Sequence, residues 1–240
     1  MSAQVVGCLA GNADDVGFGD ALAFGDFDGD GHPDLAVGSQ EIGASALPVD
    51  RPVYVFDGED FGGSTCSLTT ASSASAAAEL VCLNSARNTP VSCESSRFGQ
   101  AIAAGDFDGD GRDDLAVGAP GASPGRDSAG IVQTIAGEAT LGTMGASEMR
   151  RGTLFLASSV ESAAFGSAVA AIPAPFGRSE IAASQSAPAS THIFYCSDLT
   201  GDTPGTVMPP DDSLIVRGCG IAPFDQTATM LDPDTVPDGS

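Results

Sequence analysis

Two copies of an acidic nonapeptide could bind a metal ion, one at residues 26–34 (DFDGDGHPD) and one at residues 106–114 (DFDGDGRDD). Each copy has an aspartate at its positions 1, 3, 5 and 9 and a glycine at position 6. Carboxylates this close together repel one another unless a cation lies among them. Alternating oxygen ligands around a tight turn suit a hard divalent ion, above all Ca²⁺. The sequence therefore predicts two calcium sites.

The same ligand set is expected in both acidic runs. The side chains of Asp26, Asp28, Asp30 and Asp34 with the carbonyl of His32 form the first set, and those of Asp106, Asp108, Asp110 and Asp114 with the carbonyl of Arg112 form the second. Gly31 and Gly111 permit the sharp turn around the ion. The side-chain types of His32 and Arg112 are expected to be incidental, because neither is a good calcium ligand. Metal binding would then contribute folding free energy, so the ions are expected to be structural.

Two other interpretations of the runs agree less well with the sequence. An EF-hand needs a bidentate glutamate at position 12 and flanking helices. Position 12 is Val37 or Val117, each inside a strand-like Leu-Ala-Val segment, so a β-hairpin loop is preferred. The second alternative is an ordinary Asp/Gly turn without metal, and four acids at matched spacing in two copies argue against it.

Each acidic run lies inside a longer repeated unit that begins with Phe-Gly. The segments before the runs are 18–25 (FGDALAFG) and 98–105 (FGQAIAAG), and the segments that overlap their ends are 34–38 (DLAVG) and 114–118 (DLAVG). Short apolar alternation on both sides of a tight loop predicts a β-hairpin. A third copy pairs 165–172 (FGSAVAAI) with 180–184 (EIAAS), and its loop has lost every acid except Glu180, so no calcium is expected there. A fainter fourth copy starts at Phe224.

The Phe-Gly start, the Asp-x-Asp-Gly-Asp-Gly-x-x-Asp loop and the Leu-Ala-Val-Gly ending resemble FG-GAP repeats. Such repeats build the β-propeller of integrin α subunits and of many bacterial surface proteins. The resemblance implies an all-β fold of four-stranded antiparallel blades, about three in number, in a single domain over residues 1–240. The repeat units would cover about 18–97, 98–164 and 165–223, with a further start at 224.

The number of blades departs from the integrin pattern, which has seven. Three blades alone would expose sheet edges and apolar faces. Three alternatives remain open: the chain is part of a longer propeller, it completes a ring by self-association, or unusual packing closes a small domain.

Several other segments are candidates for the outer parts of blades. The strand candidates are 53–56, 130–135, 152–156, 192–196 and 213–216, and residues 4–9 could be an outer strand that closes a blade begun elsewhere. The Ala/Ser-rich segment 69–79 is expected to be an inserted surface loop or a short helix.

Composition indicates which classes of binding partner and which cellular compartment to expect. The net charge of −23 argues against nucleic-acid and anionic-membrane binding, which need basic patches. No apolar stretch is long enough to span a membrane. Six widely spaced cysteines favour disulfides and an oxidising compartment over buried free thiols, and leave their pairing open. A secreted or cell-surface protein is expected, with its signal peptide absent from this sequence.

Catalytic motifs are weak, so no enzymatic activity is expected of the chain. Residues 121–125 (GASPG) match the Gly-x-Ser-x-Gly pattern, but a nucleophile elbow needs a strand-turn-helix context that this Gly/Ala/Pro segment lacks. The two histidines are His32, in an acidic run, and His192, with no obvious serine or aspartate partner.

The favoured function is a calcium-binding adhesion module for a protein or glycan ligand. The alternatives are a propeller domain of a larger secreted enzyme, since FG-GAP repeats also occur in phospholipase-type and polysaccharide-acting proteins, and a self-associating scaffold.

Overall fold

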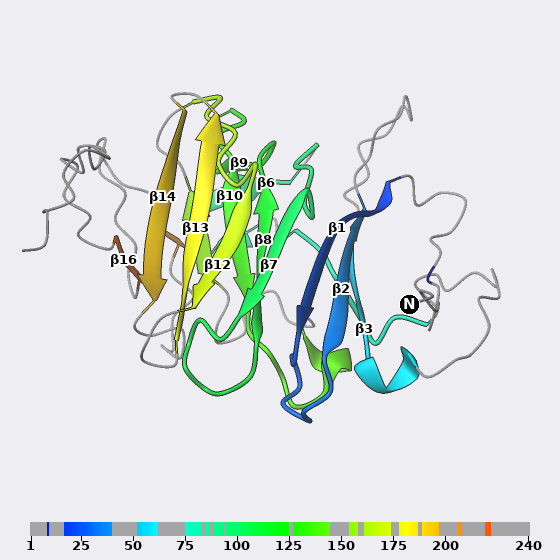
Figure 1. Cartoon of the computed structure of the whole chain (residues 1–240). Helices are drawn as coiled ribbons and strands as arrows, with labels where there is room; N and C mark the ends of the chain where they lie inside the picture. Colours follow the sequence, from blue (N-terminus) through cyan, green and yellow to red (C-terminus); the bar gives the residue numbers. More distant parts are fainter. Residues whose placement is uncertain are drawn as a thin grey trace, which may run out of the picture.

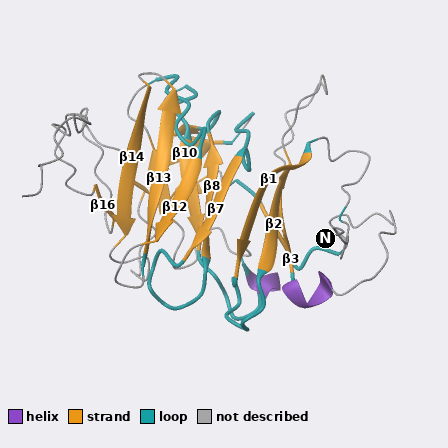
Figure 2. Ribbon diagram, in the orientation of Figure 1, coloured by secondary structure: helices purple, strands orange, loops and turns teal. Residues whose placement is uncertain are grey.

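The apolar segments on either side of each acidic run form antiparallel hairpins in the computed structural model (Figure 1). The structure describes residues 9, 17–39, 52–61, 75–82, 85–86, 89–93, 95–124, 127–144, 154–157, 161–173, 178–186, 189–196, 206–207 and 219–221. Within these residues, strands dominate and the helical elements are short 3₁₀ turns (Figure 2).

Three sheets follow one another along the chain, and each is an antiparallel meander. The first holds β1 (Phe18–Gly25), β2 (Asp34–Ser39), β3 (Val53–Phe56) and β4 (Ala78–Leu80). The second holds β7 (Ala101–Gly105), β8 (Asp114–Ala119), β10 (Ile131–Ile135) and β11 (Leu154–Ala157), with β15 (Thr206–Val207) added parallel to β11. The third holds β12 (Val169–Pro173), β13 (Ser179–Ser186), β14 (Ala189–Cys196) and β16 (Cys219–Ile221). These are the predicted blades, and the all-β fold class is confirmed.

Smaller elements connect the blades. A short sheet holds β5 (Ser85–Ala86), β6 (Thr89–Ser92) and β9 (Ser123–Pro124), and the 3₁₀ turns are η1 (Gly58–Phe61) and η2 (Leu141–Thr143). A disulfide joins Cys82 to Cys93 beside this short sheet, as the cysteine count suggested. None of the described helices is long and apolar enough to cross a membrane.

Most of the predicted outer strands are present. β3, β10, β11 and β14 coincide with or overlap the candidates at 53–56, 130–135, 152–156 and 192–196. The candidate at 213–216, residues 4–8 and the repeat start at 224 lie outside the described residues. The expectation for 69–79 is wrong at its end, because Ala78 and Glu79 pair with β3 as part of β4.

The blades stack through their innermost strands, with β7 between β1 and β12 (Figure 1). Small residues permit this close approach. A Cβ added at Gly25 would lie 3.1 Å from the Cβ of Ala104 in the next blade, and one added at Gly105 would lie 3.2 Å from that of Ala171. The blade-to-blade contact is therefore repeated, and it places the acidic hairpins at the same end of neighbouring sheets.

Candidate metal sites

Each acidic run is the tight loop between the first two strands of its blade. Gly25 pairs with Asp34 and Gly105 with Asp114 at the ends of the two hairpins, so the run begins where the first strand stops. The phenylalanines at position 2, Phe27 and Phe107, are fully buried. Burying an aromatic ring is worth several kcal/mol, so it anchors each loop against the core.

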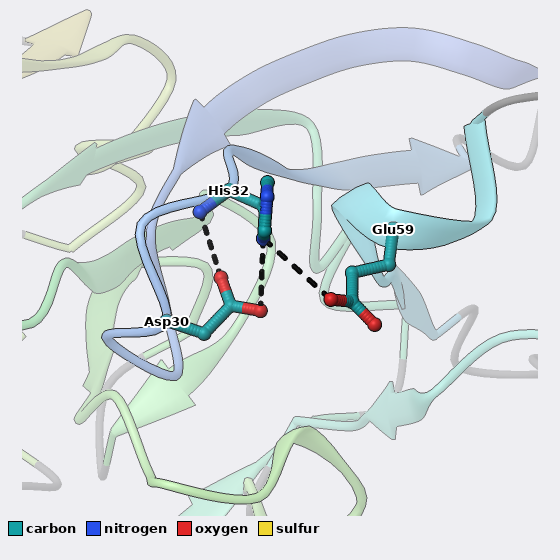
Figure 3. A group of neighbouring side chains, drawn as sticks. All are labelled: Asp30, His32 and Glu59. Atoms are coloured by element: carbon teal, nitrogen blue, oxygen red, sulfur yellow. Dashed lines mark hydrogen bonds and ion pairs between the residues drawn. The ribbon is translucent and has the colours of Figure 1, made fainter.

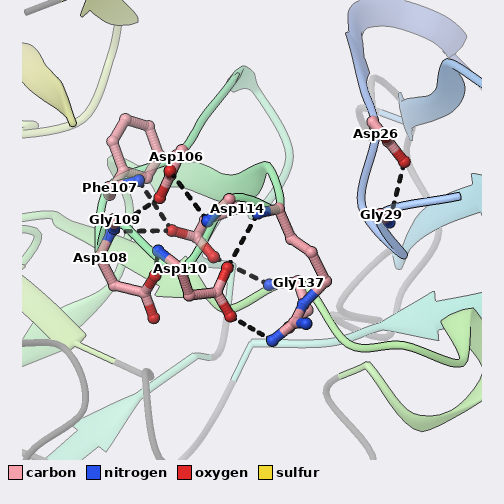
Figure 4. Close-up of polar contacts among 11 residues, drawn as sticks. Asp26, Gly29, Asp106, Phe107, Asp108, Gly109, Asp110, Asp114 and Gly137 are labelled. Carbon is pink, nitrogen blue, oxygen red and sulfur yellow. Dashed lines mark hydrogen bonds and ion pairs between the residues drawn. The ribbon is translucent and has the colours of Figure 1, made fainter. Parts of the chain in front are cut away.

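Three of the four predicted carboxylates converge in each loop. Asp26, Asp28 and Asp34 offer oxygens that all lie within 4.8 Å of one another. Asp106, Asp108 and Asp114 do the same in the second loop, which Figure 4 shows. Three carboxylate oxygens at this separation match the ligands that Ca²⁺ takes, and the remaining positions of such an ion are ordinarily filled by carbonyls and water. The donor set therefore fits a calcium ion.

Backbone N–H groups hold the position-1 carboxylate inside the turn. Gly29 and Gly31 donate to the two oxygens of Asp26 at 2.8 and 3.0 Å, and Gly109 and Gly111 donate to those of Asp106 in the same way. All four glycines have φ between 78° and 93°, a region that side chains disfavour. The glycine at position 4 is thus as necessary as the one at position 6, although only position 6 was singled out from the sequence.

The position-9 carboxylates are buried and bonded through both oxygens. Asp34 accepts from the N–H of Phe27 and of Gly58, both at 2.9 Å. Asp114 accepts from Phe107 at 2.8 Å and from Gly137 at 2.9 Å.

The donors Gly58 and Gly137 each lie two residues beyond the third strand of their blade. Their contribution was missed in the sequence. A signal was present, because a Gly-Glu pair follows the third strand in both blades, at 58–59 and 137–138.

Burial raises the pKa of several carboxylates in the two loops. It raises the pKa of Asp114 to about 7, although three backbone N–H groups oppose the shift, and the charge of Asp108 adds to it. Burial is also the main cause of the raised pKa of Asp28, Asp34 and Asp108. Ionising such a group requires compensation, and a divalent cation among the three oxygens would provide it.

The position-5 aspartates lie outside these triads and pair with the side chain at position 7. Asp30 Oδ2 lies 3.2 Å from His32 Nδ1, which is also 3.7 Å from Glu59 Oε1, and all three residues are exposed (Figure 3). The hydrogen bonds that Asp30 accepts from His32 lower the pKa of Asp30. The side-chain contact between the two residues also raises the pKa of His32. In the second loop the guanidinium of Arg112 pairs with Asp110. The position-7 residues are therefore not incidental, since each supplies a cation or a donor to the position-5 acid.

The third blade keeps the hairpin without the acids. β12 and β13 pair in register from Val169 with Ala183 to Pro173 with Ser179. Glu180 lies within this ladder, opposite Ile172, and residues 174–177 of the loop are outside the described part. Glu180 thus belongs to a strand and not to a carboxylate group among the described residues.

The serine of the Gly-x-Ser-x-Gly match has a structural contact. Ser123 lies in β9, and its hydroxyl accepts a hydrogen bond from the N–H of Ser128 at 3.0 Å. This hydrogen bond closes a local turn after β9. A nucleophile elbow needs a strand-turn-helix arrangement instead.

One known family matches parts of the first two blades, and known proteins are similar to about half of the chain. The FG-GAP repeat family matches residues 18–46 and 98–135. Phosphatidylinositol-glycan-specific phospholipase D from Mus musculus is 37% identical over 130 residues, and the proteins of the same name from Rattus norvegicus and Homo sapiens are 36% and 35% identical over 134 and 117 residues. The aligned region is about half of this chain and spans only 12–14% of each relative. The family match falls on the hairpins that hold the two carboxylate triads, so the chain carries FG-GAP repeats in its first two blades.

Proposed function

We propose that the chain is a calcium-binding propeller module in which one Ca²⁺ ion is held by each acidic loop. The observation that carries this proposal is the convergence of three carboxylates at the same place in two successive blades. When bound, the ion would neutralise these carboxylates. Asp26 and Asp28 lie in the turn and Asp34 begins β2, so an ion shared among them would tie the turn to the second strand. The role is structural.

Thermal unfolding tests the calcium proposal directly. We expect the melting temperature to fall when a chelator is added and to recover with Ca²⁺, but not with Na⁺ at matched ionic strength. A ligand at 100 times its Kd stabilises by about 2.7 kcal/mol per site. The double variant Asp26→Ala/Asp106→Ala should lose the response, while Glu161→Ala, at an exposed position outside both loops, should keep it. An unchanged melting temperature on chelation would contradict the proposal.

We further propose that the module works outside the cell or at its surface and binds a protein or glycan without catalysing a reaction. The Cys82–Cys93 disulfide supports an oxidising compartment. The charge of −23 disfavours polyanionic partners. A glycan and surface-protein binding array, read with and without Ca²⁺, tests this. Saturable binding that requires Ca²⁺ is expected, and an absence of any saturable ligand would count against it.

A second candidate is a propeller domain belonging to a larger enzyme. The names of the relatives favour it, since they are phospholipases specific for phosphatidylinositol-glycan and are much longer than the aligned region. In that setting this chain would position an enzyme or its substrate, and the cleavage would occur elsewhere. The isolated chain should release no glycosylphosphatidylinositol-anchored reporter from vesicles. Release by the purified chain would overturn the proposal that it is not itself catalytic.

A further inference from the structure

We propose that the two acidic loops are coupled across the joint between the first and second blades, with Asp113 as the positioning residue that links them. An ion in the second loop would then prepare the first loop for its own ion. This inference rests on the proposed calcium sites and concerns how they act on each other.

The first link is a reciprocal pair between Asp113 and Asp26. The N–H of Asp113 donates to the carbonyl of Asp26 at 2.9 Å, and the N–H of Asp26 donates to Asp113 Oδ2 at 3.0 Å. Asp26 is a member of the first triad, and Asp113 directly precedes Asp114 of the second. Two hydrogen bonds therefore join the backbone of one candidate ligand to the neighbour of another.

The second link runs through the Gly-Glu pair after β10. Gly137 donates its N–H to Asp114 Oδ1 at 2.9 Å, and the next residue, Glu138, donates its N–H to the carbonyl of Phe27 at 2.9 Å. Phe27 in turn donates to Asp34 Oδ2, also at 2.9 Å. A path of three hydrogen bonds, joined through the backbone of residues 137–138 and of Phe27, thus connects Asp114 of the second triad with Asp34 of the first.

These links give the coupling a physical cause. An ion bound by Asp106, Asp108 and Asp114 would fix the backbone on both sides of Asp113 and the position of Gly137. The first loop would then lose less conformational entropy when it binds its own ion. Repulsion between the two cations opposes this effect, but salt screens it over about 8 Å. By linkage the effect is reciprocal, and its expected size is about fivefold, at the low end of allosteric coupling.

The reciprocal pair distinguishes this joint from its neighbours. The residue equivalent to Asp113 in the first loop is Pro33, which has no N–H to donate. In the third blade the equivalent place is taken by Ser179, whose N–H donates to the carbonyl of Asp106 at 2.6 Å. The backbone hydrogen bond at position 8 is thus present at both joints. At the joint between the first and second blades, the carboxylate of Asp113 adds a second bond by accepting from the N–H of Asp26.

The test is a Ca²⁺ titration of the ¹⁵N-labelled full chain, with the amide signals of Gly31 and Gly111 reporting on the first and second loops separately. The Kd at Gly31 is compared between a chain with an intact second loop and the Asp106→Ala variant. We expect the affinity of the first loop to fall about fivefold in Asp106→Ala. With Asp113→Ala present as well, the ratio should fall clearly below fivefold, and the part that remains is carried by the backbone bonds of Asp113 and Glu138. Asp113→Asn retains an acceptor oxygen and should restore the ratio, and Glu161→Ala should leave it unchanged.

The outcomes separate the coupling from the calcium proposal. If neither glycine signal responds to Ca²⁺, the calcium sites themselves are contradicted. If both respond and the Kd at Gly31 does not depend on the second loop, the sites stand and the coupling is overturned. If Asp113→Asn behaves like Asp113→Ala, the charge and not the hydrogen bond transmits the effect, and the role assigned to Asp113 is wrong.

Discussion

The two acidic loops share one pattern of aspartates and differ in their surroundings. In the first loop Asp28 is partly exposed and position 7 is His32, whereas in the second Asp108 is buried and position 7 is Arg112. Burial raises the pKa of both position-9 aspartates, and that of Asp114 reaches about 7. The same motif therefore places its position-9 carboxylate in two different settings. The spacing of the acids brings three carboxylates together in each loop, and packing sets how strongly their pKa is shifted.

The loops should be alike in their dependence on the buried ring at position 2. Phe27→Ala and Phe107→Ala each remove a fully buried aromatic side chain, so each should cost about 3–5 kcal/mol of unfolding free energy. Urea denaturation measures this loss. A cost below about 1 kcal/mol for either variant would show that its loop is not anchored in this way.

The loops should differ in the pH dependence of the chelated protein. The raised pKa of Asp114 means that the folded chain binds a proton that the unfolded chain has released above pH 3.8. Stability from this group is therefore present at low pH and is lost as the pH rises toward about 7, and the whole effect is on the order of 4 kcal/mol.

Urea unfolding in chelator at a series of pH values between 4 and 8 measures this loss. Asp114→Asn should flatten the slope strongly and Asp34→Asn should change it in the same direction. With Ca²⁺ the trend should reverse, because ion binding requires the ionised carboxylates. A chelated protein that becomes more stable as the pH approaches 7 would contradict the account.

Gly58 and Gly137, which donate hydrogen bonds to the position-9 aspartates, allow a matched pair of substitutions. A Cβ at Gly137 would meet the carbonyls of Asp113 and Phe27 at 2.5 and 2.7 Å, so Gly137→Ala disturbs both loops. At Gly58 the added atom would overlap the carbonyl of Pro33, within the first loop. Each should cost about 1–3 kcal/mol.

Two-site Ca²⁺ titration tells these substitutions apart. Gly137→Ala should weaken binding at both glycine reporters, whereas Gly58→Ala should weaken it mainly at Gly31, with a smaller effect at Gly111 through the coupling. Gly142→Ala is the control, because its Cβ would meet only one backbone oxygen, at 3.4 Å. Equal effects of Gly58→Ala and Gly137→Ala on both reporters would remove the distinction.

The smallest effect is expected at Phe24, an exposed residue of β1 in the first blade. Phe24, 65% exposed, takes the place that Ala104 and Ala171 occupy in the close joints. Ile172 takes the place of Gly25 and Gly105. We therefore expect that a second copy does not extend the stack by repeating the same joint, because Ile172 would meet Phe24.

Light scattering in Ca²⁺ should accordingly give the mass of one chain, 23.8 kDa. Phe24→Ser should change the unfolding free energy by less than about 0.5 kcal/mol. A closed multimer that dissociates on this substitution would restore the hypothesis that copies complete a ring.

The sequence predicted the parts of the structure that depend on local spacing. The hairpins follow from apolar alternation around the acidic runs, and the triads follow from the aspartates at positions 1, 3 and 9. The contacts of Asp113 and Glu138 with the first loop were not predicted. They arise where two blades meet, and the residues that they join are far apart in the chain, so local spacing alone does not identify the partners.

Short elements were also beyond the sequence pattern. β5, β6 and β9 are two to four residues long, which is too short for a periodic signal. β4 is the end of a segment whose Ala/Ser composition favours a loop or helix, and pairing with β3 overrides that preference.

The most direct test of the account is anomalous scattering from crystals grown with Ca²⁺. The account predicts two peaks, one among Asp26, Asp28 and Asp34 and one among Asp106, Asp108 and Asp114, with none in the third hairpin. An absence of density in both triads at saturating Ca²⁺ would contradict it. A single ion bound instead by Asp30, His32 and Glu59 would contradict it equally.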